Sequence, residues 1–267
     1  MIARNRLTFA LPWLLLGVFF VQGLFLIRAM SATADEATFN IVNGYSYLKT
    51  RDYRMSPANP ALLREWEALP LLFLKPRLDL NKDSWREAET VPFAREFLYT
   101  DNRELADRIL NWARFMNLLL GLALGFVVYS WSRDLYGDWG GILSLAFYVF
   151  CPNLLAHSSI AGTDIGVTLF SVMAAFSLWK YLESLEGKGL WLFCLSLALA
   201  CAAKYNALIF VPLFLGIVWA KRGYAAFKTA AFSSAFLAFL LVWASYGFEF
   251  KPLLSGAVPR DARHSTT

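Results

Sequence analysis

The sequence predicts an all-α polytopic membrane protein. Of its 267 residues, 58% are hydrophobic and 16% are aromatic, and the mean hydropathy is +0.46. Soluble domains are usually about 45–50% apolar, so this excess favours a membrane protein. The apolar residues also fall in runs, and a spanning helix needs roughly 20 of them. We expect about seven transmembrane helices.

Charge and cysteine content argue against several other classes of protein. The formal net charge is +5, and we attribute the basic excess to membrane orientation, because no basic patch interleaved with aromatic residues suggests nucleic-acid binding. Cys151, Cys194 and Cys201 lie inside apolar runs, without metal-ligand or disulfide spacing. The sequence has no Walker loop, dinucleotide fingerprint or HExxH motif.

The first expected span covers residues 7–30 and follows two basic residues, Arg4 and Arg6. A secretory signal peptide is the alternative, because residues 32–34 (ATA) imitate a cleavage site. Signal peptides have apolar regions of about 7–15 residues, and this one is longer, which favours a retained helix. Either interpretation puts Asp35 outside the cytoplasm.

Residues 31–107 form a polar loop that is too long for a simple connection, and such loops usually carry function or small helices of their own. We expect helices at residues 36–49 and 60–74, and a third at 103–114 that leads into the next span. The first two have apolar residues along one side and are predicted to lie on the membrane surface. A solvated loop domain is the alternative.

The remaining spans are separated by short polar segments. A tight turn is expected at residues 133–137, and polar residues 204–206 should divide one long apolar stretch into two short helices, since exposed backbone in lipid is costly. The expected spans are residues 111–131, 139–155, 165–181, 189–220 with its break, and 229–245. The membrane module is thus residues 1–252, and residues 253–267 form a polar tail, an apparent truncation point.

Basic residues near the helix ends predict the orientation of the chain. With a cytoplasmic N-terminus, the basic residues on the cytoplasmic side are Arg4, Arg6, Arg133, Lys180, Lys188, Lys221, Arg222 and Lys228. The long loop, residues 157–164 (HSSIAGTD) and the break at Lys204 then lie outside. The candidate polar chemistry therefore gathers on the extracytoplasmic face of a multi-pass protein of a bacterial inner membrane or plasma membrane.

Two pairs of polar residues stand at the predicted outer surface. Asp35 and Glu36 follow the first span, where partial desolvation suits a carboxylate to act as a general base. Asp35 could instead be the N-cap of the following helix. His157 and Asp164 lie at the outer ends of the third and fourth spans. Asp164 could also be an N-cap, and His157 a lone interfacial histidine.

Two cations are expected at membrane depth, where ionisable groups usually pair or serve a site. Arg114 lies about one turn inside the second span, and Lys204 lies in the break between two short helices. Both suit an anionic phosphate near the outer interface. Arg114 could alternatively extend to the lipid headgroups, which is less natural for Lys204.

Several segments together resemble the phospholipid-carrier-dependent glycosyltransferases of the GT-C superfamily, which include protein O-mannosyltransferases and aminoarabinose-to-lipid-A transferases. The similarity covers most of the chain in the same order. The segments are DEATFNIVNGYSYLKTRDYRMSPANPALLREWEALPLL, FLYTDNRELADRILNWAR, SRDLYGDWGGILSLAFYVFCPNLLAHSSIAGTD, AAKYNAL and YGFEFKPL.

The resemblance implies an inverting transfer of a sugar from a polyprenyl-phosphate carrier to an extracytoplasmic acceptor, which could be a protein, a lipid or a glycan. Some relatives bind a divalent metal ion and others do not, and no other cofactor is expected. The implied site residues are Asp35 as the base, Glu36 as the second acid, Arg114 and Lys204 at the donor phosphate, and His157 and Asp164 near the pocket.

Two departures from the family pattern keep other interpretations open. Residues 59–62 read Asn-Pro-Ala-Leu where relatives often have His-Pro-Pro-Leu, and the chain ends soon after the seventh span. The sequence could be a fragment, or a partner chain could supply the rest. A non-catalytic carrier-binding or scaffold subunit is therefore the alternative. The break at Lys204 also suggests a transporter or flippase, although no inverted repeat is found.

Overall fold

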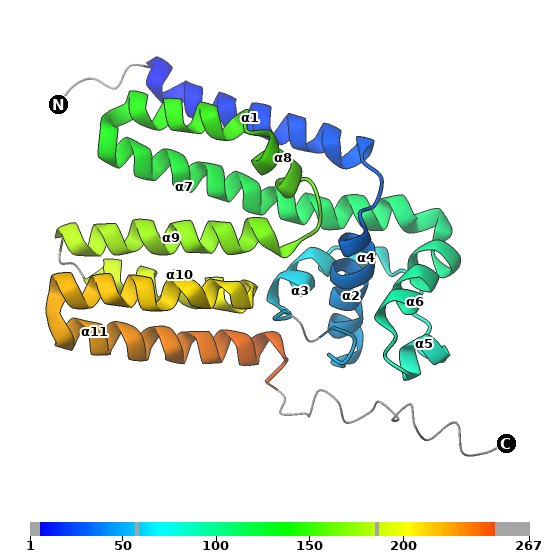
Figure 1. Ribbon diagram of the computed structural model, residues 1–267. Coiled ribbons are helices and arrows are strands. Elements are labelled where there is room, and N and C mark those ends of the chain that lie inside the picture. Colours follow the sequence, from blue (N-terminus) through cyan, green and yellow to red (C-terminus); the bar gives the residue numbers. More distant parts are fainter. Residues whose placement is uncertain (1–5, 57–58, 185–186, 249–267) are drawn as a thin grey trace.

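A computed structural model describes residues 6–56, 59–184 and 187–248 (Figure 1). Within these ranges every regular element is a helix, which confirms the predicted all-α class. Residues 253–267, predicted as a polar tail, and Arg4 lie outside the described residues.

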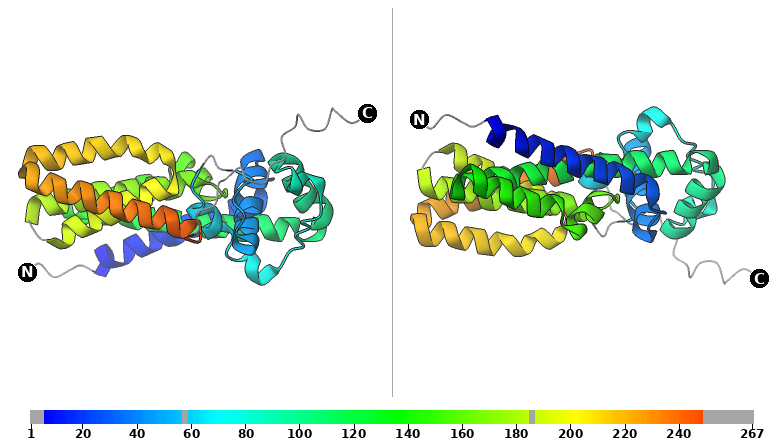
Figure 2. Two further views of the ribbon diagram at one scale, coloured as in Figure 1. Left: turned by 90° about the horizontal axis from the view of Figure 1, so that it is seen from below. Right: turned by 90° about the horizontal axis from the view of Figure 1, so that it is seen from above.

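Five helices lie side by side in a bundle, as Figures 1 and 2 show from different directions: α1 (Arg6–Ala29), α7 (Ala106–Val149), α9 (Thr163–Ser184), α10 (Gly187–Ala203) and α11 (Phe210–Ser245). Four segments are long and apolar enough to cross a membrane, namely Leu7–Ala29, Arg103–Val149, Thr163–Ser184 and Tyr205–Ser245, and Gly187–Ala203 is a shorter apolar helix. In the described part of the chain, α1 packs against α7, so it is an integral part of this bundle.

Two of these helices are hairpins. The backbone of α7 turns at Gly137, with φ 77° and ψ −179°, and that of α11 turns at Gly223, with φ 77° and ψ −178°. Glycine suits both positions because side chains disfavour positive φ. When the two arms of each hairpin are counted separately, the described residues hold seven apolar helical segments of unequal length, the same number as the expected spans.

The break predicted at residues 204–206 is present. Helix α10 ends at Ala203, Lys204 is extended (φ −156°, ψ 134°), and the 3-10 helix η4 (Tyr205–Ile209) leads into α11. Another short helix, α8 (Pro152–Ser158), joins α7 to α9 and begins at a proline, which fits the first turn of a helix. The C-terminal end of α10, which Lys204 follows, and α8 lie at the same end of the bundle (Figure 1).

The long loop folds into a small helical domain at that end, which we call the loop domain (residues 31–105; Figure 2). Its α-helices are α2 (Ile41–Thr50), α3 (Leu62–Ala68), α4 (Leu71–Leu74), α5 (Asp83–Arg86) and α6 (Thr90–Arg95). Two π-helical turns, η1 (Glu36–Asn40) and η2 (Glu96–Asp101), and the 3-10 turn η3 (Arg103–Leu105) complete it.

The loop domain packs around an apolar core that includes Val42, Tyr45, Phe93 and Phe97, each at most 1% exposed, and that continues onto the first turns of α7. The helices predicted at 36–49 and 60–74 are present, the second one as α3 and α4. The apolar side of α2 faces this core, so that helix packs inside the loop domain, whereas α4 leaves Phe73 89% exposed.

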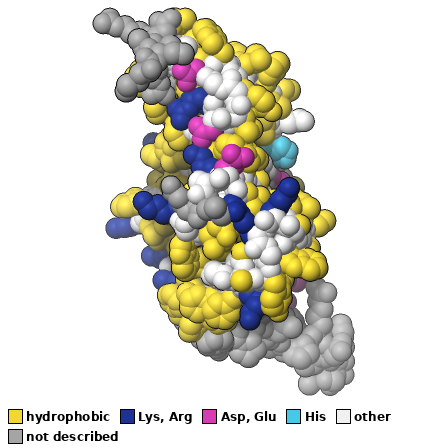
Figure 3. Space-filling model, turned by 90° about the vertical axis from the view of Figure 1, so that its left-hand side faces the viewer, with side chains coloured by type: hydrophobic (Ala, Val, Ile, Leu, Met, Phe, Trp, Pro, Cys, Tyr) yellow, Lys and Arg dark blue, Asp and Glu magenta, His cyan; other side chains and the backbone are white. Residues whose placement is uncertain are grey.

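The opposite end of the bundle, which we call the turn end, carries Gly137, Gly223 and the N-terminal start of α1 (Figure 1). Figure 3 views this end and shows Lys and Arg side chains among hydrophobic ones. Among them, Lys180 binds Asp134 at 2.9 Å, and Arg222 donates to the carbonyl of Tyr181 at 3.0 Å. Lys180 and Arg222, two of the basic residues predicted to be cytoplasmic, therefore lie away from the loop domain.

Candidate functional site

The chain leaves α1 and enters the loop domain through a reciprocal capping arrangement. The backbone N–H of Thr33 donates to Glu36 Oε2 at 2.8 Å, and the N–H of Glu36 donates to Thr33 Oγ1 at 3.4 Å. This is the capping box that a Thr-x-x-Glu pattern forms at the start of a helix. The N-cap role predicted for Asp35 therefore falls to Thr33, and the side chain of Asp35 makes no capping hydrogen bond.

Glu36 forms a buried ion pair with Arg114 of α7. Arg114 Nε lies 2.7 Å from Glu36 Oε1, and Nη2 lies 2.9 Å from Oε2. The side chains of both residues are 1% exposed. The pair is bidentate, the geometry in which a guanidinium binds a carboxylate most strongly.

The other N–H groups of Arg114 bind the end of α1. Nη1 donates to the carbonyls of Ile27 and Met30 at 3.0 and 2.8 Å, and Nη2 donates to that of Ser31 at 2.8 Å. A guanidinium has five N–H donors, and these five contacts use all of them. Arg114 therefore satisfies carbonyls that the last turn of a helix leaves without partners.

Glu36 also holds the segment between α8 and α9. Its Oε1 accepts the N–H of Ala161 at 2.8 Å, and Asn40 Nδ2 donates to the carbonyl of Ala161 at 3.1 Å. From α7, Asn117 Nδ2 donates to the carbonyls of His157, at 2.9 Å, and Ile160. Residues 157–161 are thus tied to both the loop domain and the bundle.

Burial alone would raise the pKa of Glu36. The hydrogen bonds from Arg114 and from the amides of Thr33 and Ala161 outweigh this effect and hold the pKa below its ordinary value of 4.5. Glu36 is therefore an ionised, fully bonded carboxylate at neutral pH.

Asp35 differs from its neighbour in every one of these respects. It is exposed, and among the described residues no hydrogen bond or ion pair engages its carboxylate. It precedes the π-helical turn η1, an uncommon conformation that is frequent at functional sites. Because Glu36 is fixed on both sides, the backbone that carries Asp35 is fixed as well.

The three remaining predicted residues come together at the start of α9. Lys204 Nζ lies 2.6 Å from Asp164 Oδ1, and His157 Nδ1 lies 3.8 Å from Asp164 Oδ2. Lys204 comes from the break after α10 and is 24% exposed, while the side chains of Asp164 and His157 are about half exposed. This group is open to an outside ligand.

The six predicted site residues therefore form two groups that share one connecting segment. The buried pair of Glu36 and Arg114 stands on one side of Ala161, and the open group around Asp164 follows three residues later. Among the described residues no three His, Cys, Asp or Glu side chains are arranged to hold a metal ion. The divalent metal ion stays a prediction, and no chemical step below depends on it.

Sequence reasoning missed three polar residues that complete this region: Thr33, Asn117 and Glu67. The Thr-x-x-Glu pattern could have revealed Thr33. Nothing local in the sequence marks Asn117, whose partners lie about 40 residues away. Glu67 of α3 is fully buried, and its sequence neighbourhood gives no sign of this burial.

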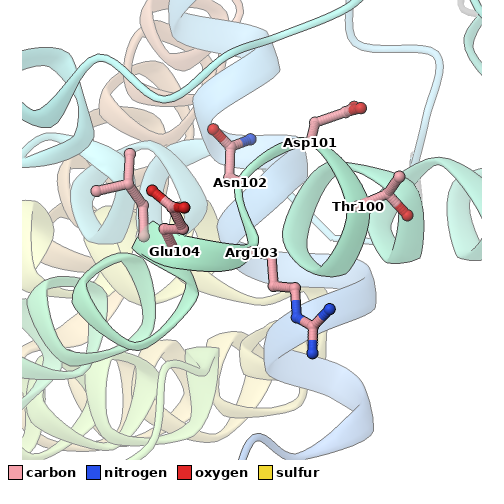
Figure 4. Close-up of a pocket in the computed structure, with 6 residues that line it drawn as sticks. Thr100, Asp101, Asn102, Arg103 and Glu104 are labelled. Atoms are coloured by element: carbon pink, nitrogen blue, oxygen red, sulfur yellow. The ribbon is translucent and has the colours of Figure 1, made fainter.

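A shallow pocket elsewhere in the loop domain is lined by residues 100–105 alone (Figure 4). The carboxamide of Asn102 there binds the backbone of Arg77, accepting its N–H at 2.7 Å and donating to its carbonyl at 2.8 Å. None of the predicted site residues lines this pocket. We interpret Asn102 as a structural link within the loop domain.

The fold and the site together define the class of protein. It is an all-helical membrane bundle with acidic and basic side chains gathered at one end. Residues 103–249 match the family model of the dolichyl-phosphate-mannose-protein mannosyltransferases. The match covers more than half of the chain, so the chain belongs to this family of GT-C membrane glycosyltransferases, which use a polyprenyl-phosphate-linked sugar.

The matched segment contains four of the predicted site residues, namely Arg114, His157, Asp164 and Lys204, whereas Asp35 and Glu36 precede it. Neither the curated proteins nor the solved structures gave a significant match.

Proposed function

We propose that this chain transfers a sugar from a polyprenyl-phosphate carrier to an extracytoplasmic acceptor with inversion at the anomeric carbon, and that Asp35 is the general base. The observation that carries the proposal is the contrast between two adjacent acids. Glu36 is buried and saturated with hydrogen bonds, whereas Asp35 is exposed on the turn that Glu36 fixes.

In an inverting transfer, the acceptor attacks the anomeric carbon from the side opposite the carrier phosphate. The acceptor group loses a proton as the new bond forms, so one positioned carboxylate has to receive it. The carrier phosphate leaves with the electrons of the broken C–O bond and needs little protonation. Asp35 suits the first task because Glu36 fixes the backbone that carries it and because its carboxylate is open to an acceptor.

The departing phosphate needs positive charge nearby as its own negative charge develops. Lys204 is the cation best suited to this task, because it is partly exposed and lies where the helix is broken. Its ion pair with Asp164 keeps the ammonium group at the outer end of the bundle until an anionic donor arrives. His157 adds a second polar group beside the same carboxylate.

For Arg114 we propose a role different from the expected donor contact. All five of its N–H groups are bonded to Glu36 and to the end of α1. Arg114 is thus best suited to be a positioning residue that holds the turn carrying Asp35, and Glu36 is its partner in that role.

The proposed topology follows from the two ends of the bundle. The turn end carries Arg133, Lys180 and Arg222, and basic residues near helix ends favour the cytoplasmic side. The loop domain and both groups of site residues then face the opposite side. The N-terminus is cytoplasmic in this arrangement.

The proposal is tested by purifying the protein, reconstituting it in liposomes and supplying dolichyl phosphate carrying radiolabelled mannose, the donor class in the family's name. Release of mannose from the carrier to a peptide acceptor or to water is measured for the wild type and for Asp35→Asn. The matched control is Asp83→Asn, since Asp83 is an exposed acid of the loop domain.

We expect Asp35→Asn to abolish release and Asp83→Asn to retain it. Normal turnover by Asp35→Asn would contradict the assignment of the base. Donor binding without turnover by the wild type would favour the carrier-binding subunit instead.

A further inference from the structure

Glu67 is a buried acid for which the proposed chemistry has no use. It lies near the end of α3 and is 0% exposed, and neither carboxylate oxygen accepts a hydrogen bond of normal geometry from any described residue. A buried carboxyl group without such partners is costly. A leucine of similar size would avoid this cost, so the acid needs another explanation.

The surroundings of Glu67 connect it to the candidate site. Helix α3 packs against α2, α7 and α9, and the backbone N–H of Gly162 faces the carboxyl group. Gly162 directly follows Ala161, which Glu36 binds, and it lies two residues before Asp164. Glu67 therefore faces the connecting segment that carries both groups of site residues.

Two other charged groups lie near Glu67. Glu36 of η1 repels an ionised Glu67, whereas Arg64 of α3 attracts it. However, Arg64 is engaged with Ser56, donating from Nη1 to its carbonyl and from Nη2 to its hydroxyl. Glu36 is already neutralised by Arg114, which leaves no cation dedicated to Glu67 among the described residues.

Burial is the largest influence on Glu67 and raises its pKa well above the ordinary value of 4.5. The amide of Gly162 and the charge of Arg64 oppose this rise, and the charge of Glu36 adds to it. Burial therefore favours the neutral carboxylic acid over the carboxylate. In that form its carbonyl oxygen can face the Gly162 amide without an uncompensated charge in the core.

We propose that Glu67 is a proton-carrying positioning residue, which in its neutral form holds residues 160–164 against α3 and thereby orients Asp164 at the candidate site. Ionisation puts a second negative charge beside Glu36 in the same core and releases the segment. The effect on sugar transfer rests on the proposed function, but the effect on the segment does not.

The test measures amide hydrogen exchange in the purified full chain, followed by mass spectrometry of peptides that cover residues 157–168. Exchange is recorded from pH 5.5 to 8 and corrected for the intrinsic effect of pH. The variants are Glu67→Gln, which imitates the neutral acid, and Glu67→Leu, which removes the polar group. The matched control is Glu65→Gln, because the pKa of Glu65 on the same helix is raised to about 7.

If Glu67 binds a proton while the segment is closed and loses it when the segment opens, protection from exchange weakens as the pH rises. The loss is up to about tenfold per pH unit and stops at the pKa of Glu67 in the closed state. We expect this loss in the wild type and in Glu65→Gln. Glu67→Gln should keep its protection, so that at pH 8 its segment exchanges at least about tenfold more slowly than the wild-type segment. Glu67→Leu should exchange fast at every pH.

Equal pH dependence of exchange in the wild type and in Glu67→Gln would overturn the proposal. Absence of the pH dependence in Glu65→Gln would also overturn it. Protection in Glu67→Leu equal to that in Glu67→Gln would also overturn it. If mannose release is observed, its rate should fall with rising pH in the wild type relative to Glu67→Gln. Failure of mannose release in all proteins would count against the proposed function and leave the exchange result to decide the role of Glu67.

Discussion

Removal of Arg114 should destabilise the protein severely. The Arg114→Met change leaves Glu36 as a buried carboxylate without its cation and deprives three carbonyls at the end of α1 of their donors. Breaking a buried ion pair from one side costs about 3–5 kcal/mol. Met30 is half-buried and Ser31 is exposed, so water can replace the lost donor at their carbonyls, and we expect a total loss in the same range.

The loss should depend on pH, because Glu36 can take up a proton when Arg114 is absent. In the wild type the lowered pKa of Glu36 contributes stability that is present above pH 4.5 and is lost as the pH falls further. In Arg114→Met the pKa should instead rise above 4.5, because burial acts without the opposing hydrogen bonds. The difference between the two proteins should therefore shrink as the medium is acidified from pH 7 to pH 4.

The assay is titration of the purified protein with sodium dodecyl sulfate in mild detergent, followed by tryptophan fluorescence, at pH 7 and at lower pH. Arg108→Met is the matched control, since Arg108 is exposed on the same helix and surface changes usually stay within about 0.5 kcal/mol. The double change Glu36→Leu with Arg114→Met should cost clearly less than the sum of the single changes.

Two results would refute this reasoning. One is an unfolding free energy of Arg114→Met within about 1 kcal/mol of the wild type at pH 7, when breaking a buried pair should cost about 3–5 kcal/mol. The other is strict additivity in the double variant, because residues that form one buried pair should be energetically coupled.

Three further outcomes are expected. Gly44→Ala should cost at least about 2–3 kcal/mol in the same unfolding assay, because a Cβ at this position overlaps the backbone of α3. Gly216→Ala is the control and should be neutral or slightly stabilising, because a Cβ at Gly216 meets open space. Equal effects of the two changes would contradict the tight contact between α2 and α3. Burial raises the pKa of Glu65 to about 7, so its ionisation should lower stability between pH 4.5 and 7. Glu65→Gln should make the decline over this range smaller while the contribution of Glu67 stays, and an unchanged decline would contradict this account. Lys204→Met should slow mannose release about 10²-fold, with exposed Lys49→Met as the control, and a normal rate would exclude Lys204 from the donor phosphate.

The membrane part of the fold could be predicted from the sequence because hydropathy is a local property. The apolar runs, the turn near Gly137 and the break at Lys204 all stand where the sequence indicates. The two arms of α7 and of α11 correspond to expected spans that polar or basic segments separate, namely residues 132–138 in α7 and residues 221–228 in α11.

The loop domain was harder to predict. Helix α2 shows a clear apolar side, which suggested a membrane surface, but that side packs against α6 and the π-helical turn η2. Hydrophobic periodicity indicates that a face is buried and does not indicate what covers it. Helices α5 and α6 have four and six residues, too few to produce a periodic signal.

The candidate site was also predictable only in part. The types of its residues could be read from the sequence, whereas their partners could not. Glu36 and Arg114 are separated by 78 positions, and no pattern in one sequence shows that they form a pair. The three-dimensional structure thus turns the predicted second acid, Glu36, and the predicted phosphate contact, Arg114, into candidates for positioning, and leaves Asp35 as the accessible acid.

The central claim is that two adjacent acids have separate roles, Asp35 in chemistry and Glu36 in structure. The most direct test measures both mannose release and resistance to unfolding for Asp35→Asn and for Glu36→Gln. We predict that Asp35→Asn loses release and unfolds like the wild type, whereas Glu36→Gln unfolds far more easily. A stable Glu36→Gln protein without release, together with an active Asp35→Asn protein, would contradict the account.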